Sequence, residues 1–276
     1  MQRTISAMVG KGSVNHNSRK FRAENVDGTR THLNIDYCNE NIKTVYHELF
    51  DEALERYNAK QIRSDRKIKD YYEKIRSSKQ EKPFHEIILQ VGGKGNMNAD
   101  TENGELAKQI LDEYYQGFQE RNPQLRVFSA HLHMDEATPH LHIDFVPFTT
   151  GSKRGLDTRV SLKQALATQG FKGGSRGDTE WSQWIQSEKE QLAAVMERYG
   201  IEWEHKGTHE KHLSVLYYKK QEREKGINAL ENKLTEKTDE YKPLSDRVRF
   251  YDKAVKTLKE MVTALNTSPE YQLPEP

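Results

Sequence analysis

Cysteine and long apolar runs are nearly absent from this chain. Cys38 is the single cysteine among 276 residues. One thiol excludes an intramolecular disulfide framework and a zinc site built from thiolates. No apolar run approaches the roughly 20 residues that cross a membrane, and the N-terminus lacks an apolar signal region. We therefore expect a soluble cytoplasmic protein with no direct membrane insertion.

Net charge and hydrophobic content are low as well. Lys and Arg together number 43 against 42 for Asp and Glu, which leaves a formal net charge of +1. Any binding to nucleic acid must therefore come from local basic patches rather than from overall charge. Hydrophobic residues make up only 34% of the chain and charged residues 31%. This balance predicts that part of the chain is helical, elongated and solvated.

The most informative feature that is present is a histidine cluster at residues 133–142, with His133, His140 and His142. Residues 126–133 and 140–145 alternate between apolar and polar, which predicts two strands. The polar link between them is short and ends in a proline, which favours an antiparallel hairpin. Such a hairpin brings the three imidazoles together, and imidazoles with open coordination positions form a divalent-metal site.

Other patterns predict further strands and helices and hence an α+β fold. Strands are expected at 4–9, 31–37, 84–91 and 201–203. Helices are expected from Ile42, over 105–118, and from an N-cap at Asp178 to a C-cap at Gly200.

Beyond about residue 210, apolar residues follow alternating steps of three and four, which predicts a coiled coil. An interior proline costs about 3 kcal/mol in a helix. Because of Pro243 we expect two helical pieces, around 209–240 and 244–265, that associate as a homodimer in preference to packing back on the core. The predicted organisation is a folded domain over 1–207, a helical dimerising tail over 208–267 and a disordered end over 268–276.

Two motifs precede the hairpin. One is His16-Asn-Ser-Arg19 in a polar loop, and the other is Arg30-Thr-His32-Leu-Asn34, which we expect to begin a strand. In this order, followed by His-x-Asp-Glu-x-Thr-Pro-His-x-His and Val-Pro-Phe, they resemble the Mob/Pre family of plasmid mobilisation relaxases, also called plasmid recombination enzymes. The resemblance covers roughly residues 5 to 207.

The resemblance implies a mainly antiparallel sheet with helices packed on it and an endonuclease of the histidine-hydrophobe-histidine class. Such a relaxase nicks one DNA strand at the origin of transfer of a plasmid or mobile element. The reaction is a metal-assisted transesterification that leaves the 5′ phosphate covalently attached to the enzyme, which rejoins the strand after transfer. Manganese or magnesium is the usual metal for such phosphoryl chemistry.

The resemblance also assigns residues. The metal triad is carried over to His133, His140 and His142, and the proposed nucleophile to His16. Asp135 and Glu136 match the acidic pair of the family, which either holds the tautomer of the nucleophile or orients the metal ligands. Arg19 is expected beside them. Tyrosine nucleophiles occur in the wider class, so the tyrosines in the domain remain alternatives: Tyr37, Tyr46, Tyr71 and Tyr72.

DNA contacts are expected from Arg30, His32 and Asn34. They are also expected from two Gly-rich loops, which we place beside the hairpin and which carry Lys153, Arg154, Lys172 and Arg176. The basic stretch 63–76 is either a further DNA contact or a solvated helix face, and Tyr71 and Tyr72 within it are candidates for stacking on bases.

Two other classes of function remain open. A metal-dependent hydrolase of small molecules also uses His-x-His pairs, but we would expect many strands after the motif, whereas this chain becomes helical beyond about residue 160. A DNA-binding or replication-control protein with the same fold but no activity is the second alternative. Nicking of supercoiled DNA separates all three.

Overall fold

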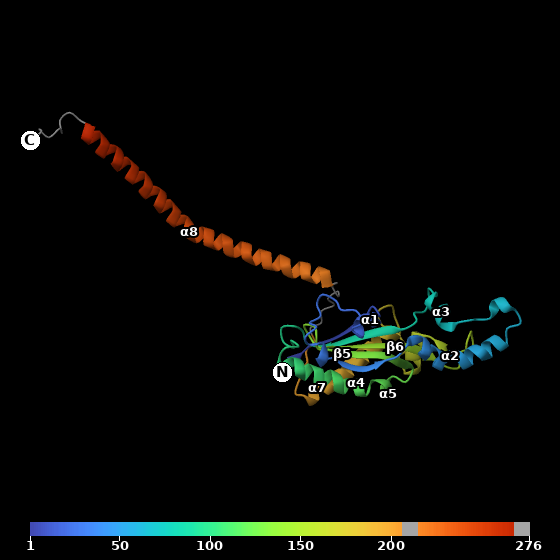
Figure 1. Cartoon of the computed structure of the whole chain (residues 1–276). Coiled ribbons are helices and arrows are strands. Elements are labelled where there is room, and N and C mark those ends of the chain that lie inside the picture. The colour runs from blue at the N-terminus through green and yellow to red at the C-terminus, as the bar shows by residue number, and fades with distance from the viewer. Residues whose placement is uncertain (206–214, 268–276) are drawn as a thin grey trace, which may run out of the picture. The chain divides into compact units, whose positions relative to one another are not determined.

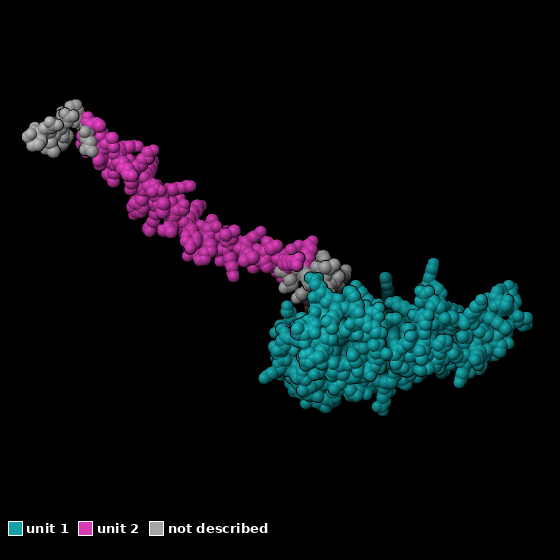
Figure 2. Space-filling view, in the orientation of Figure 1, with its two compact units in different colours: residues 1–206 teal, residues 207–276 magenta. Residues whose placement is uncertain are grey.

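The computed structural model describes residues 1–205 and 215–267. The chain divides into two compact units, Met1–Lys206 and Gly207–Pro276, which Figure 2 colours separately. The domain boundary that we expected at 207/208 and the disordered end that we expected at 268–276 lie outside the described residues.

A six-stranded sheet forms the centre of the first unit. Its strands follow the order β2 (Ile5–Val9), β4 (His85–Val91), β6 (His140–Thr149), β5 (Leu125–His133) and β3 (Ile35–Asn39), and β7 (Arg159–Val160) also pairs with β6. Every pairing in this sheet is antiparallel, which confirms the predicted α+β fold class. A small parallel sheet joins β1 (Gln2–Arg3) to β8 (Glu202–Trp203), the expected edge strand.

One face of the six-stranded sheet carries the main core. Leu141, Ile143 and Phe145 alternate along β6 into this core, which explains the apolar half of the sequence pattern. The covering helices are α4 (Glu102–Gln116), α5 (Phe118–Arg121), α6 (Leu162–Thr168) and α7 (Glu180–Arg198). Figure 1 shows α4, α5 and α7 together on one side of the strands.

The N-cap of α7 is Thr179, and the predicted N-cap Asp178 is therefore wrong by one residue. The side chain of Thr179 accepts a hydrogen bond from the Ser182 backbone N–H, and the Ser182 side chain accepts one from the backbone N–H of Thr179, so the two form a capping box. The C-cap is Tyr199, so the predicted C-cap Gly200 is also off by one residue; Gly200 follows it with φ at +71°, the left-handed conformation that commonly ends a helix.

The opposite face of the sheet is shared between a second core and a polar region. Helices α2 (Ile42–Ala59) and α3 (Tyr71–Arg76) pack with Phe128 and Val146 from the far halves of β5 and β6. The short helix α1 (Val14–Asn17) lies on this face as well, because Val14 packs against the second core. The short 3-10 helix η2 (Ser64–Arg66) connects α2 to α3.

The strand that we expected over 31–37 is only half correct. Residues Thr31–Leu33 form a 3-10 helix, η1, and β3 begins at Ile35. The backbone N–H groups of Leu33 and Asn34 bond to carbonyls three residues earlier, at 2.9 and 3.2 Å, instead of joining the sheet. Leu33 is exposed, so the apolar alternation that suggested a strand reflects no burial at this position.

The second unit contains α8 (Val215–Thr267) as one helix with Pro243 inside it, so the expected break into two pieces is wrong. Proline removes one backbone hydrogen bond, to the carbonyl four residues earlier, which is that of Asp239. Residues around Pro243 are exposed, so water can hydrate that carbonyl. Figure 1 shows that the helix changes direction about halfway along its length. Among the described residues, we find no helix whose length and hydropathy suit a bilayer span.

Candidate metal centre and active site

The β5–β6 hairpin brings the three predicted metal histidines together. His133 pairs with His140 across the two strands, and His131 pairs with His142. The ring centroids of His133, His140 and His142 lie 4.7 to 5.2 Å apart. Because side chains alternate along a strand, all three rings project from the face opposite the main core.

Each triad ring has one nitrogen fixed by a hydrogen bond. His133 Nε2 lies 2.8 Å from the Asn17 carbonyl, and His140 Nδ1 lies 2.8 Å from the Thr138 carbonyl. His142 Nδ1 lies 2.6 Å from Glu86 Oε1. Since carbonyl and carboxylate oxygens only accept, each of these nitrogens carries a proton, and in a neutral ring the other nitrogen keeps its lone pair.

The lone-pair nitrogens fit a divalent metal ion. His133 Nδ1 and His142 Nε2 are buried and have no hydrogen-bond partner. Burial lowers the pKa of His133 and lowers that of His142 to about 4, so both rings stay neutral and able to ligate. An imidazole whose far nitrogen is held by an oxygen is the usual arrangement of a metal ligand.

Two overlapping groups of ligand atoms have the compactness of a metal site. One consists of His16, His133 and His142, and the other of His133, Glu136 and His140, with the atoms of each group within 4.8 Å of one another. Neither group is the predicted triad itself, because His140 and His142 fall in different groups. His133 belongs to both groups, which places the centre of the candidate site beside it.

Glu86 is a buried partner of this site that sequence reasoning missed. Its carboxylate accepts from Gly12 N at 2.6 Å and from Asn17 Nδ2 at 2.8 Å, in addition to His142. Burial alone would raise its pKa, but the contacts with His142, Gly12 and Asn17 lower it, so Glu86 is ionised. An acidic residue at an alternating position of the apolar strand 84–91 was the available signal.

Asp144 and Asn17 extend this buried network. Asn17 Nδ2 also lies 3.0 Å from Asp144 Oδ2, which accepts from Ser129 Oγ at 3.1 Å. Burial and the negative charge of Glu86 raise the pKa of Asp144 to about 7. The Asn of the His-Asn-x-Arg motif therefore links α1 to two strands.

His16, the predicted nucleophile, lies beside the triad. Its ring centroid is 6.0 Å from that of His133 and 6.2 Å from that of His142. His16 Nε2 lies 3.4 Å from Glu136 Oε1 and 3.3 Å from Arg19 Nη1. The ring is half-buried, so it remains accessible from solvent.

Glu136 lies at the centre of the cluster. Its Oε1 is 3.0 Å from Arg19 Nη2, 3.8 Å from His140 Nε2 and 3.9 Å from His133 Nδ1. Burial would raise its pKa, but the hydrogen bond with His16 and the charges around it lower the pKa to about 2. Glu136 is therefore a carboxylate that reaches both the nucleophile candidate and two triad rings.

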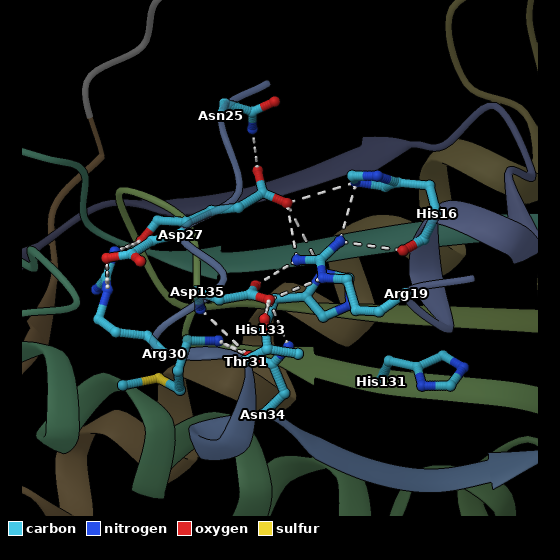
Figure 3. Close-up of polar contacts among 12 residues, drawn as sticks. His16, Arg19, Asn25, Asp27, Arg30, Thr31, Asn34, His131, His133 and Asp135 are labelled. Atoms are coloured by element: carbon cyan, nitrogen blue, oxygen red, sulfur yellow. Dashed lines mark hydrogen bonds and ion pairs between the residues drawn. The ribbon is translucent and has the colours of Figure 1, made fainter. Parts of the chain in front are cut away.

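The Asp135 side chain is bonded to residues of the two upstream motifs. It accepts from both Arg19 nitrogens Nε and Nη2, from Thr31 Oγ1 at 3.0 Å and from Asn34 Nδ2 at 2.8 Å. Figure 3 shows Arg19 between Asp135 and His16. Arg19 has φ at +56°, a left-handed backbone that turns the chain after α1 so that the guanidinium reaches both groups.

The second motif supports this framework. Asn34 Oδ1 accepts from the backbone N–H groups of Met134 and Asp135, at 2.7 and 3.2 Å. Arg30 donates to the Glu136 carbonyl at 3.2 Å and pairs with Asp27 and Asp100. His32 is exposed, and its Nδ1 contacts the Thr29 carbonyl at 2.9 Å, so the structure does not bring it to the histidines.

The Gly-rich basic loops do not flank the triad, and that expectation is wrong. The loop with Lys153 and Arg154 leaves β6 after Thr149, about 23 Å along the strand from His142. The loop with Lys172 and Arg176 joins α6 to α7, which cover the opposite face of the sheet. Contact between these two loops and DNA stays a prediction, and proximity to the metal site no longer supports it.

Three of the four alternative tyrosines have hydroxyl groups that are already hydrogen-bonded to other residues. The hydroxyl of Tyr37 donates to Asp112 and that of Tyr46 to the Pro83 carbonyl, both at 2.7 Å. Tyr71 is buried and accepts from Val160 N, so the idea that it stacks on bases is wrong. Burial raises the pKa of all three. Tyr72 alone of the four is half-buried without a hydrogen bond from its hydroxyl in the described residues.

Similar proteins are found by sequence and by structure. A plasmid recombination enzyme type 2 from Staphylococcus aureus (strain Mu50 / ATCC 700699) is 27% identical over 254 residues, which cover 90% of this chain and 51% of the relative. A plasmid recombination enzyme from Bacillus sp is 26% identical over 245 residues, or 86% of this chain and 49% of the relative. The chain thus spans about half the length of the curated relatives it matches.

Among solved structures, the MobM relaxase domain, Mn-bound and with plasmid pMV158 oriT DNA, is 20% identical with a TM-score of 0.49 and covers 79% of this chain and 99% of that one. The sequence profile of the family described as plasmid recombination enzyme matches residues 13–220. This match covers most of the chain and includes α1, both upstream motifs and the histidine hairpin. The chain therefore belongs to the plasmid recombination enzyme family.

Proposed function

We propose that the chain is a DNA relaxase that nicks one strand at an origin of transfer. The nick forms a covalent bond between the enzyme and the 5′ phosphate, and the enzyme later rejoins the strand. Membership of the plasmid recombination enzyme family supports this function. The observation that carries it is the position of His16 beside His133 and His142, which present buried ring nitrogens without a hydrogen-bond partner.

In this proposal His133, His140 and His142 hold Mn²⁺ or Mg²⁺. Bound there, the ion would draw charge from the non-bridging oxygens of the scissile phosphate and fix its orientation. Glu86, Asn17 and Thr138 keep the three rings in the tautomers that ligation needs. MobM, a structurally similar relaxase domain, is Mn-bound in its structure with origin DNA.

His16 acts as the nucleophile. His16 Nε2 lies 3.4 Å from Glu136, which only accepts, and 3.3 Å from Arg19 Nη1, which only donates. In this proposal the carboxylate holds the proton on Nε2, which leaves the lone pair on Nδ1 for attack. A nitrogen–phosphorus bond forms while the bond from phosphorus to the 3′ oxygen breaks, and the 3′ oxygen takes a proton from solvent. The phosphoramidate retains the energy of the bond, so attack by a 3′ hydroxyl reverses the reaction and rejoins the strand.

Arg19 and Asp135 act as positioning residues. Arg19 donates to the His16 carbonyl at 3.0 Å and to Glu136 at 3.0 Å, and Asp135 fixes the guanidinium from the other side. These contacts set the distance between His16 and Glu136.

We propose further that residues 1–207 form the catalytic domain, that Arg30, His32 and Asn34 lie along the DNA path, and that the helical tail joins two copies of the chain.

The test is a nicking assay with the full chain and its His16→Ala variant. Each is incubated with Mn²⁺ and supercoiled plasmid that carries a candidate origin, and the DNA is denatured without protease. We expect the wild-type protein to give a nicked circle whose 5′ end is blocked by protein, and His16→Ala to give none.

Other results would point to other readings. A blocked nick that survives in His16→Ala would transfer the role of nucleophile to Tyr72, which among the four candidate tyrosines is half-buried without a hydroxyl partner in the described residues. Retention of DNA without a nick would favour a binding or replication-control protein. No effect on any DNA would favour a hydrolase of small molecules.

A further inference from the structure

A groove of about 610 Å³ lies next to the candidate site on the same face of the sheet. It runs between the start of α1, the end of β3 and Tyr72 of α3. Phe128 forms part of its floor and belongs to the second core, so the groove lies beside packed side chains. Its volume falls within the range of roughly 300 to 1,000 Å³ that is usual for ligand sites.

The walls of the groove combine aromatic rings with unused amides. Tyr72 and Phe84 are both half-buried, so each presents part of its ring to the groove while the rest packs against the second core. Within the described residues, the side chains of Asn15 and Asn39 make no hydrogen bond. Ring faces stack on nucleobases, and free amides pair with their polar edges.

The charge at the groove is positive. Lys20 lines it, is exposed and forms no ion pair with any residue of the described ranges. The one acidic residue of the lining, Glu40, is neutralised by Arg126 through two contacts of 2.9 Å. An unpaired lysine beside aromatic rings suits the phosphate backbone of a single strand.

The groove is joined directly to the candidate active site through α1. Ser13, Val14 and Asn15 line the groove, and His16 is the next residue, with its ring toward His133 and His142. Arg19 and Lys20 are likewise consecutive, the first bonded to Asp135 and Glu136 and the second lining the groove. One short element therefore separates the groove from the nucleophile candidate.

We propose that this groove binds a nucleotide of the single-stranded DNA close to the scissile phosphate, with its base stacked on Tyr72 and Phe84 and its backbone phosphate on Lys20. The inference rests on the proposed relaxase function for the identity of the strand. It adds a base-binding subsite that fixes how the DNA enters the active site from the side of α3.

The first test is binding of fluorescein-labelled thymidine 12-mer to the full chain without metal, followed by fluorescence anisotropy. We expect Tyr72→Leu to weaken binding about tenfold, Tyr72→Phe to bind like the wild type because the ring is kept, and Lys20→Gln to weaken binding severalfold. The matched control is Lys163→Gln, which removes an exposed lysine from α6 beside the main core. It is expected to bind normally.

The second test locates the base. A 12-mer with 5-iododeoxyuridine is photo-cross-linked to the wild-type chain, and the modified peptide is identified by mass spectrometry. Cross-links on Tyr72 or Phe84 support the groove. Cross-links confined to other peptides overturn it, as does wild-type affinity in both Tyr72→Leu and Lys20→Gln, or no binding of the 12-mer by the wild type.

Nicking by the same proteins separates this inference from the proposed function. Manganese-dependent nicking by the wild type, with unchanged 12-mer binding in Tyr72→Leu and Lys20→Gln, would leave the relaxase intact and remove the subsite. Cross-links on Tyr72 without any nicking would keep the subsite and remove the relaxase.

Discussion

At the scale of single residues, the candidate site depends on side chains that do not ligate. Glu86 is buried, accepts from three different donors and fixes the ring of His142. The pairing of β4 with β6 fixes where the Glu86 carboxylate lies, because Ile88 is opposite His142 and Glu86 is opposite Asp144. The orientation of the His142 ring therefore depends on a third strand of the sheet as well as on the hairpin.

The first prediction concerns Glu86. In Glu86→Gln, an NH₂ group replaces one of the two oxygens that accept hydrogen bonds, so a donor faces a donor. The negative charge beside His142 is also lost. We expect the affinity for Mn²⁺ to fall about 10- to 100-fold, measured by isothermal titration calorimetry. Glu105→Gln, which neutralises an exposed carboxylate on α4, serves as the control. Equal affinities in wild type and Glu86→Gln would show that His142 does not need this partner.

The second prediction concerns Asp144. Its pKa in the folded protein, about 7, lies well above the ordinary value for an aspartate, 3.8. The folded protein therefore holds a proton that the unfolded chain has already released, and stability falls as pH rises from about 4 to about 7. Asp144→Asn has no such proton and does not lose this stability. The difference in free energy of unfolding between Asp144→Asn and the wild type should therefore shift in favour of the variant by on the order of 3 kcal/mol between pH 5 and pH 8.

Urea unfolding of the metal-free chain at both pH values measures this difference, with the exposed Asp178→Asn as control. A difference between the two proteins that is equal at both pH values would contradict the raised pKa. A difference that shifts in favour of the wild type at the higher pH would mean that folding lowers the pKa of Asp144 and stabilises its anion.

At the scale of elements, the close approach of two backbones sets the site. The chain after β2 passes over Glu86, and a Cβ on Gly10 would lie 1.9 Å from Glu86 Oε2. Only glycine leaves room at this point, because the carboxylate is held by Gly12, Asn17 and His142 and has little freedom to move.

The third prediction follows from this contact. Gly10→Ala should displace the Glu86 carboxylate and weaken Mn²⁺ binding about tenfold or more, as Glu86→Gln does. Gly93→Ala is the matched control, because a Cβ at Gly93 meets nothing within 4 Å. Calorimetry with Mn²⁺ and circular dichroism on all three proteins would check it. Normal affinity in Gly10→Ala would mean that the loop moves aside without disturbing Glu86.

At the scale of the whole molecule, the long helix α8 carries an apolar stripe that is exposed in the part of the chain that the structure describes. Leu230, Leu234, Leu244 and Leu258 are each more than half exposed. These leucines follow the steps of three and four that a coiled coil requires, and exposed stripes of this kind associate with a partner helix.

The fourth prediction is that the chain is a homodimer through α8. Replacing Leu234 and Leu258 by Asp places charge in the seam, so sedimentation equilibrium should show a dimer for the wild type and a monomer for the double variant. The control replaces Thr238 and Thr257, two other exposed residues of α8, by Asp. A wild-type monomer at micromolar concentration, or a double variant that stays dimeric, would rule out this use of the stripe.

Local patterns in the sequence were sufficient for the strands, the hairpin and most helices. Apolar alternation in residues 126–145 has one cause, burial of one face of a strand, so it located β5, β6 and the histidine face. Alternation at 31–37 was misleading, because Leu33 is exposed and local hydrogen bonds form a 3-10 turn. Pro243 wrongly predicted a break in the C-terminal helix, because an exposed helix tolerates the loss of one backbone hydrogen bond.

The sequence by itself determined the family motifs, the three histidines on one hairpin and the apolar spacing of the tail, because each depends on residues close together in the chain. Only the tertiary structure decided that Glu86, Asn17 and Asp144 surround the triad, that the Gly-rich loops lie away from it and that a groove adjoins His16. Those facts depend on which strands pair and on which face each helix packs, and pairings between residues far apart in the chain leave no local periodicity to detect.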